Sequence, residues 1–225
     1  MQAEIDPVLW DGRAIAVTTI WDWRARFYDV CEGSGLRRAP FKRALFKDMR
    51  GRVLFVAVGT GSDIRHFPPG FEIVAIDISP EMLRRAERRA KRYRGALTLL
   101  QEDAMDMRFS DAFFDTVVTS CTMCSVPDPV RALQELYRVL RPGGRLLMFE
   151  HVRSRNPPLA WTLDLMTLWT RWSGTEMNRD TVRNAKLAGF VITNIESIFL
   201  DIILAIRGIK PVHDRERECR ACQES

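Results

Sequence analysis

Five short apolar segments, separated by turns and helical patterns, constrain this chain more than any other feature. Arg52–Val58 and Phe71–Asp77 are nearly continuous runs of Val, Leu, Ile, Phe and Ala, as expected for strands buried on both faces. Three similar runs follow at Ala96–Leu100, Phe114–Ser120 and Arg145–Val152. Strands that alternate with helices form parallel sheets through crossover connections, so the sequence predicts an α/β fold.

Helical patterns surround these strands. Residues 13–31 and Arg37–Arg52 carry apolar side chains at helical spacing before the first strand. Ser79 is the predicted N-cap of a helix that runs to Arg94. A further helix is predicted over Pro129–Leu140.

The C-terminal part has a different pattern. Arg141–Gly144 is a turn signal, and Leu159–Trp172 is an apolar helix. Asn178 is the predicted cap of a helix that ends before a hairpin of Val191–Ile198 and Asp201–Ile206. We therefore expect a Rossmann-like, seven-stranded sheet, mostly parallel, with an antiparallel C-terminal hairpin and helices on both faces.

Composition excludes several classes of protein. With 225 residues, 46% hydrophobic and 28% charged, the chain is neither disordered nor a disulfide-stapled miniprotein. No apolar run reaches the roughly 18–20 residues of a membrane span, and the start lacks the layout of a secretory signal. We expect a cytoplasmic protein. A net charge of +5 favours anionic partners, either lipid headgroups or nucleic acid, and a solvated basic face is the alternative.

The five cysteines include two C-x-x-C pairs, Cys121 with Cys124 and Cys219 with Cys222. Their odd number and the absence of a signal argue against a disulfide framework. The two pairs lie much farther apart than the roughly 15–20 residues of a compact zinc ribbon. No metal site is assigned, and a zinc ion shared by the pairs is the alternative.

Candidate ligand contacts follow three successive strands. Gly59-Thr60-Gly61 forms a glycine-rich turn whose N–H groups can approach a ligand. Asp77 ends the second strand, where a carboxylate can accept hydrogen bonds from ribose hydroxyls. Asp103 follows the third strand and suits an adenine amino group. A tight turn, a helix cap and a loop acid are the respective structural alternatives. The full G-x-G-x-x-G is missing, so an adenosine ligand without pyrophosphate fits better.

The order of these motifs resembles the class I S-adenosylmethionine-dependent methyltransferases. It is similar to their type 11 group, which includes quinone C-methyltransferases and bacterial phospholipid N-methyltransferases, and to microsomal alkyl-thiol methyltransferases. The resemblance covers about residues 50–208. The motifs that carry it are Gly59–Gly61, Asp77, Asp103-Ala104, Phe114–Val118 and Leu136–Gly144, with His66–Gly70, Cys124–Val126 and Phe149–Val152 shared with the alkyl-thiol enzymes.

The resemblance implies S-adenosylmethionine as cofactor and S-adenosylhomocysteine as product. Gly59 and Gly61 are expected under the methionine moiety, Asp77 at the ribose and Met82 beside the adenine. Thr119, Ser120 and Cys121 are expected to face the sulfonium and the acceptor. The complete cofactor-binding set that we predict is Gly59, Thr60, Gly61, Asp77, Ile78, Met82, Asp103, Ala104, Met105 and Ser120.

Two residues depart from the family pattern. Phe55 stands where an acidic residue is usual, and Ala57 stands where glycine is usual. The missing carboxylate normally organises polar contacts near the methionine amine. Asp63 or Asp29 as its replacement is a hypothesis. A non-catalytic adenosine-binding module is the alternative class that these departures suggest.

Two residues are the predicted catalytic groups. An amine or thiol acceptor must lose a proton before attack, and His151, at the end of the fifth strand, is the candidate base. A strand-end histidine bonded to backbone is the alternative. Tyr28 or a nearby Trp is predicted to hold the sulfonium or a cationic acceptor by cation–π contact, and Tyr28 is the residue assigned to this role.

The predicted acceptor is a hydrophobic small molecule or lipid. The segments 13–31 and Leu159–Trp172 supply aromatic side chains that suit such an acceptor or a lipid surface, and core packing is the alternative. A phospholipid amine is the first candidate, followed by an alkyl thiol or a quinone ring. Contact with an anionic membrane surface is left open, and nucleic acid is not expected as a partner.

Three regions are predicted. Residues 1–50 form an N-terminal helical lid or cap, and residues 51–210 form the methyltransferase domain, with an acceptor-side helical insertion at 151–177. Residues 211–225 form a polar, flexible tail.

Overall fold

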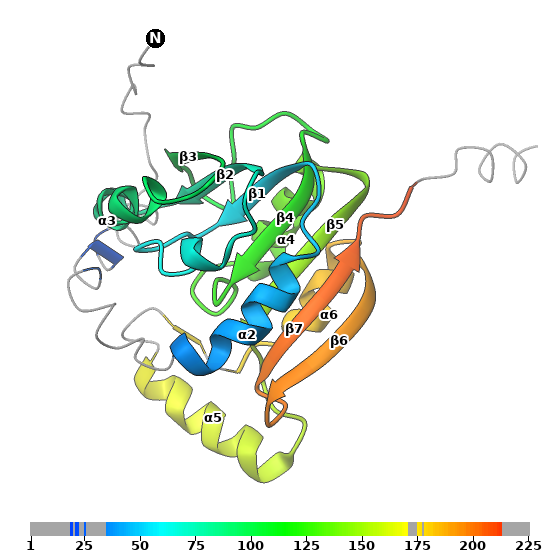
Figure 1. The fold of residues 1–225 in the computed structure, drawn as a ribbon. Helices are drawn as coiled ribbons and strands as arrows, with labels where there is room; N and C mark the ends of the chain where they lie inside the picture. Colours follow the sequence, from blue (N-terminus) through cyan, green and yellow to red (C-terminus); the bar gives the residue numbers. More distant parts are fainter. Residues whose placement is uncertain are drawn as a thin grey trace, which may run out of the picture.

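A seven-stranded sheet organises the chain in the computed structural model, which describes residues 19, 21–22, 25, 35–170, 175–176 and 178–212. The strand order is β3-β2-β1-β4-β5-β7-β6. All adjacent pairs from β3 to β5 are parallel, and β7 runs antiparallel to both neighbours. The predicted Rossmann-like fold is therefore confirmed (Figure 1). The strands are β1 Arg52–Val56, β2 Glu72–Asp77, β3 Ala96–Gln101, β4 Phe114–Ser120, β5 Leu140–His151, β6 Val191–Phe199 and β7 Ile203–Ile209.

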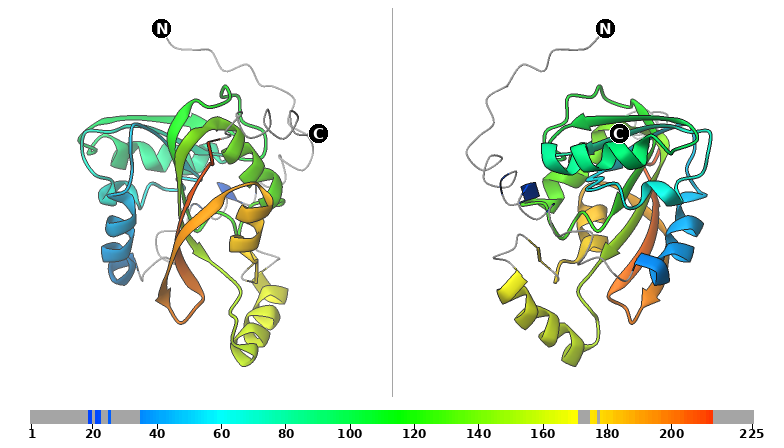
Figure 2. Two further views of the ribbon diagram at one scale, coloured as in Figure 1. Left: turned by 90° about the vertical axis from the view of Figure 1, so that its right-hand side faces the viewer. Right: turned by 60° about the vertical axis from the view of Figure 1, so that its left-hand side comes forward.

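Helices cover both faces of this sheet, as predicted. The helices are α2 Gly35–Phe46, the 3-10 turn η1 Ile64–His66, α3 Pro80–Ala90, α4 Pro129–Val139, α5 Pro157–Thr170 and α6 Thr181–Leu187. Figures 1 and 2 show α2 and α3 on one face, α4 and α6 on the other, and α5 beyond the end of the sheet.

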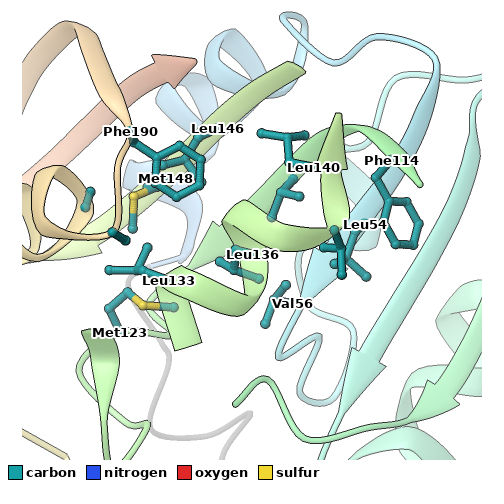
Figure 3. Close-up of a cluster of buried hydrophobic side chains, with 14 of the residues drawn as sticks. Leu54, Val56, Phe114, Met123, Leu133, Leu136, Leu140, Leu146, Met148 and Phe190 are labelled. Atoms are coloured by element: carbon teal, nitrogen blue, oxygen red, sulfur yellow. The ribbon is translucent and has the colours of Figure 1, made fainter. Parts of the chain in front are cut away.

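Two buried clusters sit on the two faces of the sheet. Leu54 and Val56 of β1 pack with Leu133 and Leu136 of α4 (Figure 3). Phe55, which alternates with them, packs on the opposite face, with its ring 5.9 Å from that of Phe46. Successive strand side chains point to opposite faces, and both faces are covered here. Because both faces are covered, the sequence of β1 is an uninterrupted apolar run.

Two helix ends differ from the sequence prediction. α2 ends at Phe46 rather than Arg52, because the following backbone is held by β4. The Arg50 N–H donates to Thr116 Oγ1 at 2.9 Å. α3 ends at Ala90 rather than Arg94, where successive turns replace the helical bonds.

Two predictions in the C-terminal half were wrong in detail. Asn178 does not cap α6: the side chain of Asp180 does, and Asn178 instead donates to Asp164 at 3.0 Å. The predicted turn at Arg141–Gly144 lies within β5, which begins at Leu140. The pairing with β4 is irregular there, so the turn residues form a bulge at the start of the strand.

Several predictions concern residues outside the described part of the chain. Of the segment 13–31, only Thr19, Trp21, Asp22 and Ala25 are described, and all four are helical. Tyr28, Asp29, Cys31 and residues 213–225 lie outside it. The region boundaries at 50, 151 and 210 therefore stay predictions. Among the described residues, no helix has both the length and the apolar character needed to cross a bilayer.

Candidate active site

A pocket of about 700 Å³, counting its open mouth, lies at the carboxyl ends of the central strands. This is where open parallel sheets bind ligands. Eight of the ten predicted cofactor contacts line it, and the exceptions are Thr60 and Gly61. The lining residues are Trp21, Val56, Ala57, Gly59, Ile76, Asp77, Ile78, Met82, Glu102, Asp103, Ala104, Met105, Ser120, Cys121, Thr122, Ser125, Val126 and Pro127.

Asp77 joins two segments of the pocket wall. Its Oδ2 accepts a hydrogen bond from the Gly59 N–H at 2.8 Å, and its Oδ1 accepts one from the Ser79 N–H at 3.0 Å. Ser79 in turn caps α3, as predicted, by accepting from the Met82 N–H. Burial raises the pKa of Asp77 to about 6, against the opposing effect of these N–H donors. One carboxylate therefore fixes the glycine turn and the start of α3 while it faces the pocket.

The glycine-rich turn packs tightly against α3. Gly61 has φ +82°, and a Cβ there would meet Ile64 Cδ1 at 2.8 Å and Ala86 at 3.1 Å. Arg89 of α3 donates to the carbonyl of Thr60 at 2.6 Å. Of the two glycines, Gly59 thus faces the pocket, and Gly61 allows the helix to approach the turn.

Ala57 lies in the pocket wall with φ +55°, in the left-handed region that favours glycine. The sequence departure at this position is therefore a strained residue in the structure. The other departure, Phe55, does not block the pocket, because its ring is buried on the α2 face against Phe46 and Phe67.

Replacing Ala57 with glycine is expected to raise the free energy of unfolding by about 1 kcal/mol, because the left-handed conformation then costs little. Urea denaturation of Ala57→Gly beside the unchanged protein measures this. Ala112→Gly, at another non-glycine residue with positive φ (54°) but in an exposed loop, is the matched control for strain outside the pocket. A stability loss in Ala57→Gly would contradict the expectation.

Glu150 organises the loop that follows β4. Its Oε1 accepts from Thr119 Oγ1 at 2.7 Å and from the Thr122 N–H at 3.1 Å, and its Oε2 accepts from the Met123 N–H at 3.1 Å. The carboxyl is fully buried, and this burial raises its pKa to about 7. Glu150 thereby holds the stretch from Thr119 to Val126 that forms one side of the pocket.

Comparison with known proteins identifies the family. The family model described as a methyltransferase domain matches residues 54–148. A thiol S-methyltransferase of Rattus norvegicus is 30% identical over 171 residues, 69% of either chain. A demethylmenaquinone methyltransferase of Deinococcus radiodurans is 37% identical over 162 residues, 67% of either chain. This chain belongs to the class I S-adenosylmethionine-dependent methyltransferases, in the type 11 group.

One further relative matches a shorter part of the chain, and a solved structure has the same fold. A phosphatidylethanolamine N-methyltransferase of Cereibacter sphaeroides is 38% identical over 112 residues, 49% of this chain and 55% of its own. The chain thus spans about half the length of that relative. A solved S-adenosylmethionine-dependent methyltransferase of Thermotoga maritima superposes with a TM-score of 0.65 at 21% identity, over 85% of this chain and 99% of its own. That likeness shows the fold alone.

The pocket of this methyltransferase fits S-adenosylmethionine, the cofactor of its family. Ser120 Oγ is buried in the wall and has no hydrogen-bond partner in the described part of the chain, as expected of a group that awaits a polar ligand atom. Asp77 presents a carboxylate to the pocket, and Ile78 and Met82 supply apolar surface beside it. These residues suit a ligand that combines hydroxyl groups with a flat base.

Of the two predicted catalytic residues, His151 and Tyr28, the structure describes only His151. His151 is the last residue of β5 and is not among the residues that line the pocket. Burial, with Arg38 and Lys42 nearby, lowers its pKa to about 4, so the imidazole is neutral at pH 7. Its role as base stays a prediction, as does that of Tyr28, which lies outside the described residues.

Asp63, the hypothetical replacement for the missing carboxylate, already has a partner. Both of its oxygens accept from Lys42 Nζ, at 2.7 and 2.9 Å, and both side chains are buried. Lys42 also lies 5.3 Å from the centre of the Phe149 ring. The hypothesis stays a prediction. It now requires Asp63 to contact the methionine amine while its carboxylate remains bonded to Lys42.

The structure places further residues in the pocket wall, outside the predicted cofactor-binding set. Trp21 lines the pocket, and its neighbour Asp22 accepts from Ser79 Oγ and from the Glu81 N–H, which ties the N-terminal segment to α3. Glu102 and Thr122 also line it. The sequence assigned the segment 13–31 to the acceptor side of the site, but it carried no signal for the contact between Asp22 and α3.

The cysteines beside the pocket are buried thiols. Cys121 lines the pocket, and burial raises the pKa of its thiol well above the ordinary value. Cys124 is buried three residues later, and its Sγ lies 3.4 Å from the Cys121 carbonyl. A raised pKa disfavours the thiolate, so packing is the better interpretation of this pair. Cys219 and Cys222 lie outside the described residues.

Proposed function

We propose that this methyltransferase acts on a hydrophobic small molecule or lipid, with a phospholipid amine as the first acceptor to test. The observation that carries the proposal is the apolar part of the pocket wall, where Trp21, Val126 and Pro127 accompany the polar groups. An apolar wall with few polar contacts suits an acceptor with alkyl or acyl chains.

The names of the relatives support the same range of acceptors. One is a phosphatidylethanolamine N-methyltransferase, and others are thiol S-methyltransferases or demethylmenaquinone methyltransferases. Alkyl thiols and quinone rings are therefore the second candidates. All three kinds of acceptor share a reacting atom attached to a hydrophobic body.

The chemistry of the cofactor and the residues of the pocket wall support the following proposed roles. When bound, S-adenosylmethionine supplies a methyl group already activated on its sulfonium, so the protein has mainly to align the acceptor and exclude water. Asp77 accepts from ribose hydroxyls, and Ser120 Oγ supplies a free hydroxyl to the pocket. His151, at the end of β5, is the proposed base for an amine or thiol proton.

Methyl transfer from labelled S-adenosylmethionine tests the acceptor. The protein is incubated separately with phosphatidylethanolamine vesicles, a long-chain alkyl thiol and demethylmenaquinone. We expect label in the phospholipid fraction, with Asp77→Ala as the inactive control. Label in the thiol or the quinone alone would replace the phospholipid amine by that acceptor, and no label in any of them would exclude all three.

The proposed location is the cytoplasm, at the membrane surface when a lipid is the acceptor. Fractionation of cells that express the chain, followed by a salt wash of the membranes, measures it. A peripheral protein is expected to leave the membrane fraction as the ionic strength rises.

A further inference from the structure

Helix α5 carries apolar side chains on two sides, and only one side is packed against the protein. Ala160 and Leu163 are buried. Trp161, Leu165 and Leu168, which recur at helical spacing on another side, are 74%, 51% and 60% exposed. A surface helix normally turns polar residues outward, so an outward apolar stripe indicates a further apolar partner.

The turn between β6 and β7 has the same character. Phe199 and Leu200 at its tip are 55% and 63% exposed. Leu200 has φ +46°, a conformation that favours Gly or Asn in a turn. Folding alone therefore gives no reason for a leucine at this position, and a partner that contacts its side chain would.

These two elements lie at the same end of the sheet as the pocket. Ile203, just after the turn, pairs with His151, the last residue of β5, and α5 follows β5 along the chain. Figures 1 and 2 show α5 and the β6–β7 turn extending beyond this end of the sheet in every view. We call Trp161, Leu165, Leu168, Phe199 and Leu200 the apolar rim.

The two carboxylates beside the apolar rim are already engaged by arginines and by a backbone N–H group. Asp164 is paired with Arg153 at 2.8 Å, and Asp201 accepts the Arg155 N–H at 2.6 Å. Arg155 is exposed and interacts electrostatically with Asp201, whereas Arg38, beside the end of β5, forms no ion pair with a described residue. Apolar side chains flanked by arginines suit a bilayer surface with anionic headgroups.

The chain after α5 is bonded directly to the pocket. The Glu176 N–H donates to the Cys124 carbonyl at 2.7 Å. Arg179 Nη1 donates to the carbonyl of Met123 at 2.7 Å and to that of Val126. A surface seated on the apolar rim would therefore lie next to the loop that lines the pocket.

We propose that the apolar rim docks onto the surface of a lipid bilayer that contains anionic headgroups. The proposal deepens the proposed function and rests on it in one respect, the supply of a lipid acceptor to the pocket. Docking places the pocket against the surface, where acceptors of this class are concentrated.

Vesicle flotation tests the docking. The probe is vesicles of phosphatidylcholine mixed with phosphatidylglycerol, neither of which carries a primary amine, so binding is measured without methyl transfer. The test variant is Trp161→Ser combined with Leu165→Ser, both at exposed positions of α5. The control is Val212→Ser, which removes a side chain 70% exposed beside Gly143 at the opposite end of β5.

We expect the unchanged protein and the control to float, and the test variant to bind vesicles at least about tenfold more weakly. Binding should weaken as salt is added. All three proteins should bind S-adenosylmethionine equally in calorimetry without lipid, which shows that the variant is folded.

The proposal would be overturned if the unchanged protein did not float, or if the test variant floated equally well. It would also be overturned if light scattering showed that the unchanged protein self-associates in lipid-free solution while the test variant is monomeric. The last result would assign the apolar rim to a second copy of the chain. Flotation without methylation of a lipid amine would support the docking surface and contradict the proposed acceptor. Failure of the docking proposal and failure of the proposed function are therefore distinguishable.

Discussion

Replacing Asp77 with alanine is expected to weaken S-adenosylmethionine binding by about hundredfold or more, which corresponds to about 2.7 kcal/mol. The same change should lower the free energy of unfolding by about 2–4 kcal/mol, because the N–H groups of Gly59 and Ser79 lose their acceptor inside the protein. Calorimetric titration with the cofactor and urea denaturation measure the two effects.

Asp77→Asn separates the charge from the hydrogen bonds. The amide keeps one acceptor oxygen, so the variant should lose less stability than Asp77→Ala. Because burial raises the pKa of Asp77 to about 6, cofactor affinity of the unchanged protein should increase as the pH rises through that value and the carboxyl ionises. The increase should be absent in Asp77→Asn. Cofactor binding by Asp77→Ala equal to that of the unchanged protein would refute the proposed role.

Replacing Glu150 with alanine is expected to destabilise the protein by about 3–5 kcal/mol. The change leaves the Thr119 hydroxyl and the N–H groups of Thr122 and Met123 buried without their acceptor. Since Glu150 holds the loop after β4, methyl transfer should fall even at a temperature where the variant is folded. Denaturation and single-turnover transfer measure the two effects.

Glu150→Gln is the matched control, because its oxygen can still accept from Thr119 and Thr122 and only the bond from Met123 is lost. The raised pKa of Glu150 also makes the free energy of unfolding depend on pH. The folded state binds the Glu150 proton more tightly than the unfolded state, so its contribution to stability is complete below the ordinary pKa of 4.5 and is lost as the pH rises through about 7. Glu150→Gln should flatten the pH dependence of unfolding in this window; an unchanged slope would contradict the assignment.

Much of the cofactor side of the site could be predicted because its signals are local. The glycine turn after β1 and the carboxylate that ends β2 depend only on neighbours in the chain and on the rule that parallel strands end at one edge. Gly59 and Asp77 accordingly meet, through the bond that joins them. The helix cap at Ser79 is local for the same reason.

Other parts of the site depended on contacts between distant segments. Trp21 and Asp22 reach the pocket and α3 only through the docking of the N-terminal segment. Lys42 meets Asp63 across 21 residues of chain, and no pattern in the sequence pairs them.

The sequence by itself determined the alternation of strands and helices, the order of the motifs and the edge of the sheet where the ligand site lies, because these follow from hydrophobic periodicity and turn chemistry. Only the tertiary structure decided which of two adjacent residues, Glu150 or His151, supports the pocket loop. Neighbouring strand residues point to opposite faces, and the packing of distant helices determines which face borders the pocket. Tertiary packing also left one side of α5 exposed, although its composition alone suits a buried helix.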